Sequence, residues 1–126
     1  MLEKWTPQRL QSFAVADDLQ VSPLYDDGRT CGTPTWIWSV VVGEHLYARA
    51  WNGQRSSWYQ AAVRQQRGRI HLAGCNFQVR FAAAPADSAV TEQIDAAYRQ
   101  KYAGSGYLLP MLQAGPQSAT VEIRPI

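Results

Sequence analysis

The sequence predicts a mainly β fold of the α+β class, with one antiparallel sheet that is closed or nearly closed on itself and has helices at its ends. Segments of alternating apolar residues follow one another across short glycine-containing turns, which is typical of β hairpins. The strand–helix–strand order of a parallel sheet does not repeat. The 126 residues, 46% of them hydrophobic, suit a single domain, 1–126, with one core.

The N-terminal part, 1–25, is expected to form a helix and an extension. The spacing predicts a helix from Pro7 to about Val15, since Thr6 can cap it and proline suits the first helical position. An extended piece follows near 20–25, and Asp26-Asp27-Gly28 signals a turn.

Residues 34–51, PTWIWSVVVGEHLYARAW, predict a β hairpin that turns at Gly43-Glu44. Its first strand is rich in aromatic and β-branched residues on both faces, so both faces should be covered. In the second strand, alternation separates two sets of side chains. One set is Leu46, Ala48 and Ala50, and the other is His45, Tyr47, Arg49 and Trp51.

The next segment predicts a helix and a second hairpin. Ser56 or Ser57 can cap a helix that runs to about Arg67 and ends at Gly68. The strands RIHLAG and FQVRFA should then pair across a turn at 74–76. Alternation places Phe77, Val79 and Phe81 inward.

The C-terminal part predicts a longer helix and a last strand. The helix should begin at Asp87 or Ser88, run to about Tyr102 and stop at Gly104, with an apolar stripe on one side. A loop with Gly106 and Pro110 follows, and ATVEIRP is the last strand. The expected buried residues are Val90, Ile94, Ala97, Tyr98, Val121 and Ile123.

Charge is distributed unevenly although the net charge is only +2. No acid occurs from His45 to Ala86, and ten of the twelve basic residues in the chain are arginines. Arginine suits phosphate and stacks on aromatic rings, so the block indicates an anionic ligand. The alternative is that the arginines only keep the surface soluble. Those in the block are Arg49, Arg55, Arg64, Arg67, Arg69 and Arg80.

Several functional classes find no support in the sequence. Cys31 and Cys75 lack a CxxC spacing and are expected to be reduced thiols, with a single disulfide as the alternative. His45 and His71 have no cysteine or carboxylate cluster, so no metal site is expected. No apolar run could cross a bilayer or act as a signal peptide, so we expect a cytoplasmic protein and no membrane partner.

The stretch 47–60, YARAWNGQRSSWYQ, is the first candidate site. A helix N-terminus presents free N–H groups and partial positive charge. Ser56 and Ser57 could add hydroxyl donors to a phosphate, and Arg49 or Arg55 could add a guanidinium group. Trp51 or Tyr47 could border a flat ring. Each part also has a plain structural explanation, with serines as caps and aromatic residues as packing.

Two loops are further candidates. In GRTCGTPTW, residues 28–36, two glycines four apart can bend the backbone and expose N–H groups, and Arg29, Thr30 and Thr33 add polar contacts next to a strand start. An ordinary turn has the same composition. In KYAGSGYLLP, residues 101–110, Tyr107 is the candidate catalytic residue because a tyrosine can donate a proton or position a quinone-like substrate. The alternative is a ring that packs against the barrel.

These motifs together resemble a known superfamily. GR-x-x-G-x-P before a hairpin, followed by a tryptophan-bearing helix, resembles the FMN-binding split-barrel superfamily and its deazaflavin-dependent nitroreductase branch. TPTWIWSVVVGEHLYARAWNGQRSSWYQAA with the later DAAYRQKY resembles a bacterial split-barrel family of unassigned function. The resemblance covers about residues 26–124 and departs from the branch at Thr30, where a lysine is usual, and at Ser56-Ser57, where His-Pro is usual.

The resemblance implies a six-stranded antiparallel split barrel that often forms a homodimer. It implies FMN or a deazaflavin coenzyme near the first hairpin and the helix start. The expected cofactor-binding residues, from this resemblance and the residue reasoning above, are Arg29, Thr33, Arg49, Trp51, Ser56, Ser57 and Trp58.

Three functions follow from these expectations. The first is a small flavin- or deazaflavin-dependent oxidoreductase in which the coenzyme carries the reaction. The second is a cofactor-free domain on the same barrel that binds a small-molecule ligand or another protein. The third, ranked last because the net charge is low, is nucleic-acid binding through the arginine-rich face.

Overall fold

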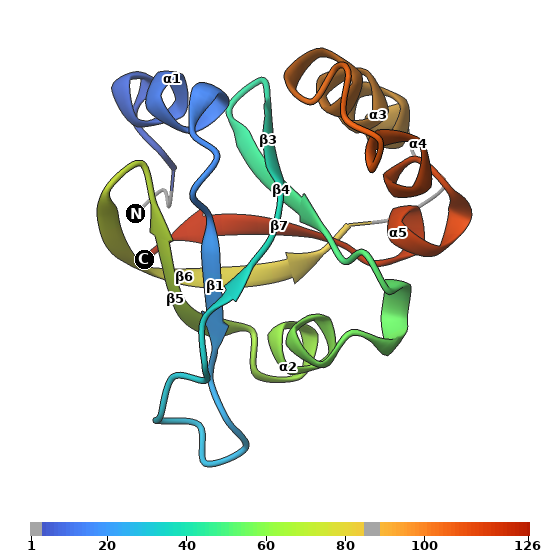
Figure 1. Cartoon of the computed structure of the whole chain (residues 1–126). Helices are drawn as coiled ribbons and strands as arrows, with labels where there is room; N and C mark the ends of the chain where they lie inside the picture. The colour runs from blue at the N-terminus through green and yellow to red at the C-terminus, as the bar shows by residue number, and fades with distance from the viewer. Residues whose placement is uncertain (1–3, 85–88) are drawn as a thin grey trace.

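A computed structural model of the chain describes residues 4–84 and 89–126. A seven-stranded antiparallel sheet curls into a half-barrel, with helices on its flanks (Figure 1), which confirms the predicted fold class. The strands are β1 (Gln20–Pro23), β2 (Thr35–Trp36), β3 (Ser39–Val42), β4 (His45–Arg49), β5 (Arg67–Leu72), β6 (Cys75–Ala83) and β7 (Thr120–Pro125). The helices are α1 (Pro7–Val15), the 3-10 turn η1 (Gly53–Arg55), α2 (Ser57–Gln65), α3 (Ala89–Lys101), α4 (Leu108–Met111) and α5 (Ala114–Ser118).

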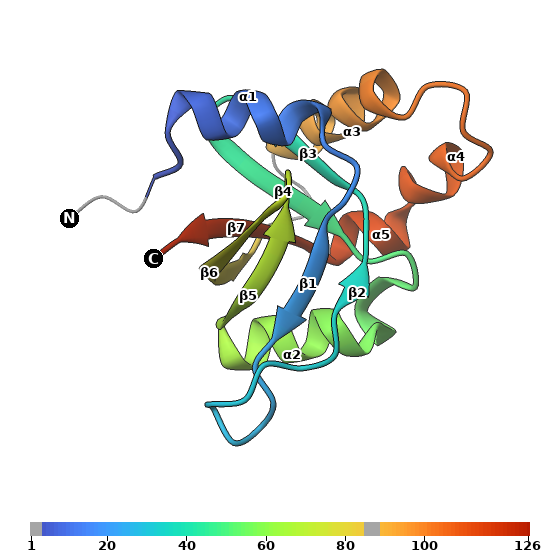
Figure 2. The same ribbon diagram turned by 60° about the vertical axis from the view of Figure 1, so that its left-hand side comes forward.

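The two ends of the sheet are joined by one short stretch of chain. The strand order is β2-β1-β5-β6-β7-β4-β3, so β2 and β3 occupy opposite ends although only Ile37 and Trp38 separate them in sequence. The chain therefore crosses from one end of the curled sheet to the other at this point (Figure 2). The amide of Ile37 donates to the carbonyl of Leu19 at 3.1 Å. The long strand predicted over 34–42 is thus two strands, which is why the sheet has seven strands and not six.

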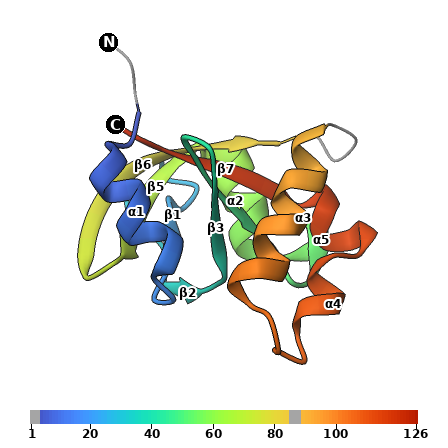
Figure 3. The ribbon, with the colours of Figure 1, turned by 90° about the horizontal axis from the view of Figure 1, so that it is seen from above.

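Apolar residues form two clusters. The larger cluster fills the inside of the curled sheet and includes Phe13, Leu46, Val79 and Ile123. The smaller cluster lies between α3 and the β3–β4 hairpin. Seen from above, α1 and α3 flank β3 on its two sides (Figure 3), and α2 lies at the end of the curled sheet opposite α1 (Figure 1). The smaller cluster consists of Val40, Tyr47, Ile94, Tyr98, Tyr102, Met111 and Leu112.

Local signals in the sequence placed several elements well. The hydroxyl of Thr6 accepts from the amide of Arg9 at 3.2 Å and caps α1 as predicted. Gly43 turns the β3–β4 hairpin with a φ of 60°. The alternation in β6 buries Val79 and Phe81.

Other boundaries differ from the prediction. Helix α2 ends at Gln65, because Gln66 adopts the left-handed conformation with a φ of 62°, and Gly68 lies within β5. The β5–β6 turn is at 73–74, since Leu72 pairs with Cys75. Pro110 lies in α4. The predicted start of the long helix at 87–88 lies outside the described residues.

Candidate functional site

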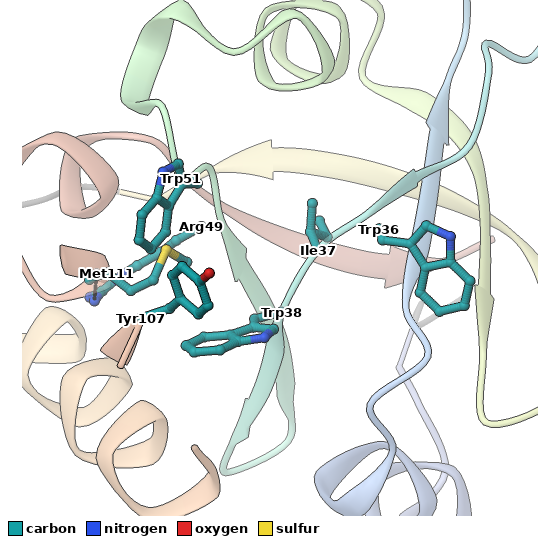
Figure 4. A pocket seen from close by; sticks show the side chains of 7 residues that line it. All are labelled: Trp36, Ile37, Trp38, Arg49, Trp51, Tyr107 and Met111. Carbon is teal, nitrogen blue, oxygen red and sulfur yellow. Dashed lines mark hydrogen bonds between the residues drawn. The ribbon is translucent and has the colours of Figure 1, made fainter. Parts of the chain in front are cut away.

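An open pocket lies where the β2–β3 joint, the end of β4 and α4 meet. It has a volume of about 290 Å³ and is lined mainly by apolar and aromatic side chains. Figure 4 shows Trp38, Trp51, Tyr107 and Met111 grouped near Arg49, while Trp36 lies beyond Ile37 with its ring turned away from this group. The lining residues, which we call the aromatic pocket, are Trp36, Ile37, Trp38, Arg49, Trp51, Tyr107 and Met111.

The aromatic rings of the pocket are held by ring–ring contacts. Trp51 and Tyr107 meet edge to face, with their centroids 5.5 Å apart. Trp38 stacks on Tyr102 at 3.9 Å with the planes 5° apart. Trp51 is 46% exposed and Tyr107 is 66% exposed. Large aromatic surface is therefore left open to solvent at the pocket mouth, where a ligand can cover it.

Arg49 forms the polar floor of the pocket, and its guanidinium group is engaged by the protein itself. Its Nη1 forms a salt bridge with Asp95 of α3 and also donates to the carbonyl of Met111 at 3.3 Å. Nη2 donates to the carbonyl of Thr91 at 3.3 Å, and Nε donates to the hydroxyl of Thr120 at 3.3 Å. The side chain has no solvent exposure. Its positive charge is thus compensated inside the protein.

Two neighbours complete this buried network. The side-chain amide of Gln117 donates to the other carboxylate oxygen of Asp95 at 3.1 Å. The hydroxyl of Tyr98 accepts from the backbone amide of Arg49 at 3.1 Å, and its ring lies 5.3 Å from the guanidinium carbon. Burial raises the pKa of Tyr98 well above its ordinary value. Tyr98 therefore stays protonated at pH values where a free tyrosine loses its proton.

The structure brings together three of the residues predicted to form a site. Arg49, Trp51 and Tyr107 all line the aromatic pocket. Arg29 lies in the exposed loop after β1 and lines a different pocket. Thr33 is exposed in the same loop, and its hydroxyl lies 3.5 Å from that of Tyr25.

The residues predicted at the start of α2 do not line the aromatic pocket. Ser56 is buried at the N-cap position without a side-chain capping bond, and Ser57 is exposed. Trp58 is buried in the larger core cluster and meets Tyr59 edge to face at 6.3 Å. The guanidinium group of Arg49 is bonded to α3, α4 and β7 instead of α2.

Sequence reasoning missed four pocket residues and the partner of Arg49. The sequence predicts Ile37 and Trp38 only as strand residues, and it gives Trp36 no role beyond its place in the strand and at the end of the candidate loop 28–36. Met111 gave no signal. Asp95 lies 46 residues from Arg49, and no sequence pattern links the two.

The comparisons with known proteins place the chain in a family. The family model described as "Uncharacterized protein conserved in bacteria (DUF2255)" matches residues 9–123. The chain belongs to the DUF2255 family. A comparison of this DUF2255 protein with curated proteins gives no match. All the residues of the aromatic pocket lie inside the part that matches the family.

Two kinds of feature are absent from the described part of this DUF2255 protein. Within residues 4–84 and 89–126, no three His, Cys, Asp or Glu side chains are grouped so that they could hold a metal ion. Over the same residues, no helix has the length and apolar character needed to span a membrane.

Proposed function

We propose that this protein binds a planar, largely uncharged aromatic molecule in the aromatic pocket. The observation that carries the proposal is the lining, in which Trp38, Trp51 and Tyr107 surround an open space of about 290 Å³. Ligand pockets are typically apolar, with a few polar groups, and begin at roughly 300 Å³. The volume of the aromatic pocket therefore suits a single ring system and is too small for a large ligand.

The charge of the pocket favours a neutral ligand. Among the residues that the structure describes, Arg49 is the only charged one that lines it, and Asp95 compensates that charge. A carboxylate or phosphate placed against Arg49 would have to compete with Asp95 and with carbonyl acceptors that are already bonded. Stacking on aromatic rings contributes about 1–3 kcal/mol per ring and does not require charge.

Lumichrome, a flavin ring without a sugar or phosphate tail, tests the proposal directly. We expect it to quench tryptophan fluorescence with saturation in the micromolar range. Trp51→Leu should weaken binding by about tenfold, because the exposed ring contact is lost. Tyr25→Leu removes an exposed aromatic ring outside the pocket and should leave binding unchanged. A lack of saturable quenching, or equal loss in both variants, would contradict the proposal.

A flavin- or deazaflavin-dependent reductase is the second candidate. The aromatic pocket, with the Tyr107 hydroxyl at its mouth, supports the ring part of this proposal. The residues do not fit the phosphate part, since Arg29, Ser56 and Ser57 do not line the pocket and Arg49 is compensated.

FMN and riboflavin separate the two candidates, because they differ only in the phosphate. Ring binding alone predicts similar affinity for both compounds. Coenzyme binding predicts that FMN binds at least about tenfold more tightly, as charge-assisted hydrogen bonds to phosphate require. Similar affinities would count against the reductase proposal and leave the ring proposal intact.

A further inference from the structure

A second pocket, on the outer side of β5, is lined by three arginines that the aromatic pocket does not include. Arg67 and Arg69 lie on β5 and are exposed, and Arg29 comes from the loop after β1. Gln78 and Cys31 also line this space, which has a volume of about 300 Å³. We call it the arginine pocket.

Strand geometry explains why two of these arginines lie together. Arg67 and Arg69 are two positions apart on one strand, so alternation places them on the same face of the sheet. Gly68 between them turns inward, where β1 passes so close that a Cβ atom would lie 2.5 Å from the carbonyl oxygen of Ser22. The close approach of β1 brings the following loop, and with it Arg29, beside β5.

The loop that carries Arg29 is fixed by its own hydrogen bonds. The carboxylate of Asp27 accepts from the backbone amides of Arg29 and Thr30, each at 2.9 Å, and from the hydroxyl of Thr30 at 2.6 Å. The Thr30 hydroxyl is the main reason that the pKa of Asp27 lies below its ordinary value. The amide of Gly32 donates to the carbonyl of Pro23 at 2.8 Å. Arg29 is thus presented on an ordered turn.

The arginines of this pocket form no salt bridges with the described acidic side chains. Over the described part of the chain, no Asp or Glu forms a salt bridge with Arg29, Arg67 or Arg69. The acid at the neighbouring loop position, Asp26, pairs with Arg64 at 3.0 Å.

We propose that the arginine pocket binds the phosphate group of a small molecule. Guanidinium groups offer planar pairs of donors that match phosphate oxygens, and three of them converge here from two segments of the chain. The site is concave and limited to about 300 Å³, which favours a small phosphorylated ligand over a polymer. The proposal uses none of the residues of the aromatic pocket, so either can fail without the other.

Titration calorimetry on the full chain, with pyrophosphate as the probe, tests the proposal. We expect saturable binding, and Arg69→Gln or Arg29→Gln should weaken it at least about tenfold through loss of charge-assisted hydrogen bonds. Arg99→Gln removes the same charge from an exposed position on α3 and is the matched control. Equal weakening by Arg99→Gln would show a general charge effect and overturn the proposal.

The two cysteines supply a second readout in the unmodified protein. Cys31 lines the arginine pocket, whereas Cys75 is exposed at the β5–β6 turn and does not. Pyrophosphate should slow alkylation of Cys31 and leave the rate at Cys75 unchanged. Equal effects at both thiols, or none at Cys31 at saturating pyrophosphate, would overturn the proposal.

A single-stranded oligonucleotide tests the choice of a small ligand. We expect it to bind no more tightly than pyrophosphate. Tighter binding that weakens steeply with salt would indicate contacts to several phosphates along a polymer. That result would overturn the proposed ligand class in favour of nucleic acid.

Discussion

Arg49 is the one buried charged side chain in the described part of the protein, and its surroundings show what such a burial requires. A charge removed from water is costly unless a partner and further hydrogen bonds compensate it. Asp95 supplies the opposite charge, and two carbonyl oxygens and the Thr120 hydroxyl accept the remaining donors. The residue therefore links β4 to α3, α4 and β7.

Replacing Asp95 should show how much this network contributes to stability. Asp95→Asn removes the compensating charge and leaves Arg49 buried, so we expect the free energy of unfolding to fall by about 3 kcal/mol. Urea unfolding measures the change. The control is Glu92→Gln, an exposed position on the same helix. If both variants lost the same stability, the salt bridge would have no special role.

The residues of the candidate site were predictable only where a local pattern marks them. Strand alternation placed Arg49 and Trp51 on one face, and Gly104 and Gly106, just before it, marked the loop of Tyr107. The prediction that Arg49 would be free to hold phosphate depended on its partners, however, and Asp95 and Met111 reach it through the fold. A single sequence gives no local signal for such contacts.

At the scale of elements, the sequence predicts features that depend on neighbouring residues, and it does not predict features that depend on packing between distant segments. Thr6 and Pro7 predicted the start of α1, and Gly43 predicted the hairpin turn. Gly68 was interpreted as the end of a helix because glycine commonly has that role. The structure shows another reason for it, which is the close passage of β1.

Gly68→Ala should therefore separate β1 from β5. The added Cβ atom would lie 2.5 Å from the Ser22 oxygen and 2.7 Å from the Pro23 Cα, both of which are backbone atoms that cannot rotate away. We expect the free energy of unfolding, measured by thermal or urea unfolding, to fall by about 1–3 kcal/mol or more. Gly115→Ala is the control. A Cβ atom added there would have no atom within 4 Å outside its chain neighbours and its own helix backbone, so this variant should not be destabilised. Equal stability of the two variants would contradict this account of Gly68.

At the scale of the whole molecule, Lys101 joins three elements. Its ammonium group, at the end of α3, donates to the carbonyl of Phe13 in α1 at 3.2 Å and to that of Ser39 in β3 at 2.7 Å. Burial lowers the pKa of Lys101 from 10.5 to about 8, while Asp17 and Asp18 oppose this shift. The packing of both helices against β3 is thus linked to protonation.

The stability of the protein should rise with pH because of Lys101. Between about pH 8 and about pH 10.5 the unfolded chain holds this proton more often than the folded chain, so the free energy of unfolding increases across that window. Urea unfolding at about pH 7.5 and about pH 9.5 tests this. Tyr98 and Tyr102, whose pKa values burial raises from 10.0, oppose the trend as the pH nears 10, so the upper measurement is made at about pH 9.5.

Lys101→Met should reduce the rise in the free energy of unfolding between the two pH values. Lys4→Met is the control, because Lys4 is the other lysine of the chain and is exposed, and it should leave the rise unchanged. The comparison uses the difference between the two pH values, because loss of the carbonyl contacts lowers stability at both. An unchanged rise in Lys101→Met would assign the pH dependence to other groups.

The joint at Ile37 and Trp38 has a consequence for self-association. The strands at the ends of the sheet are short, with two residues in β2 and four in β3, and β3 lies between α1 and α3 (Figure 3). Little unpaired backbone remains to template a strand from another chain, so fibre-like stacking has few starting points. The homodimer that the split-barrel resemblance implies stays a prediction. If two copies do associate, they must meet through side-chain surfaces and not by extending one sheet across both.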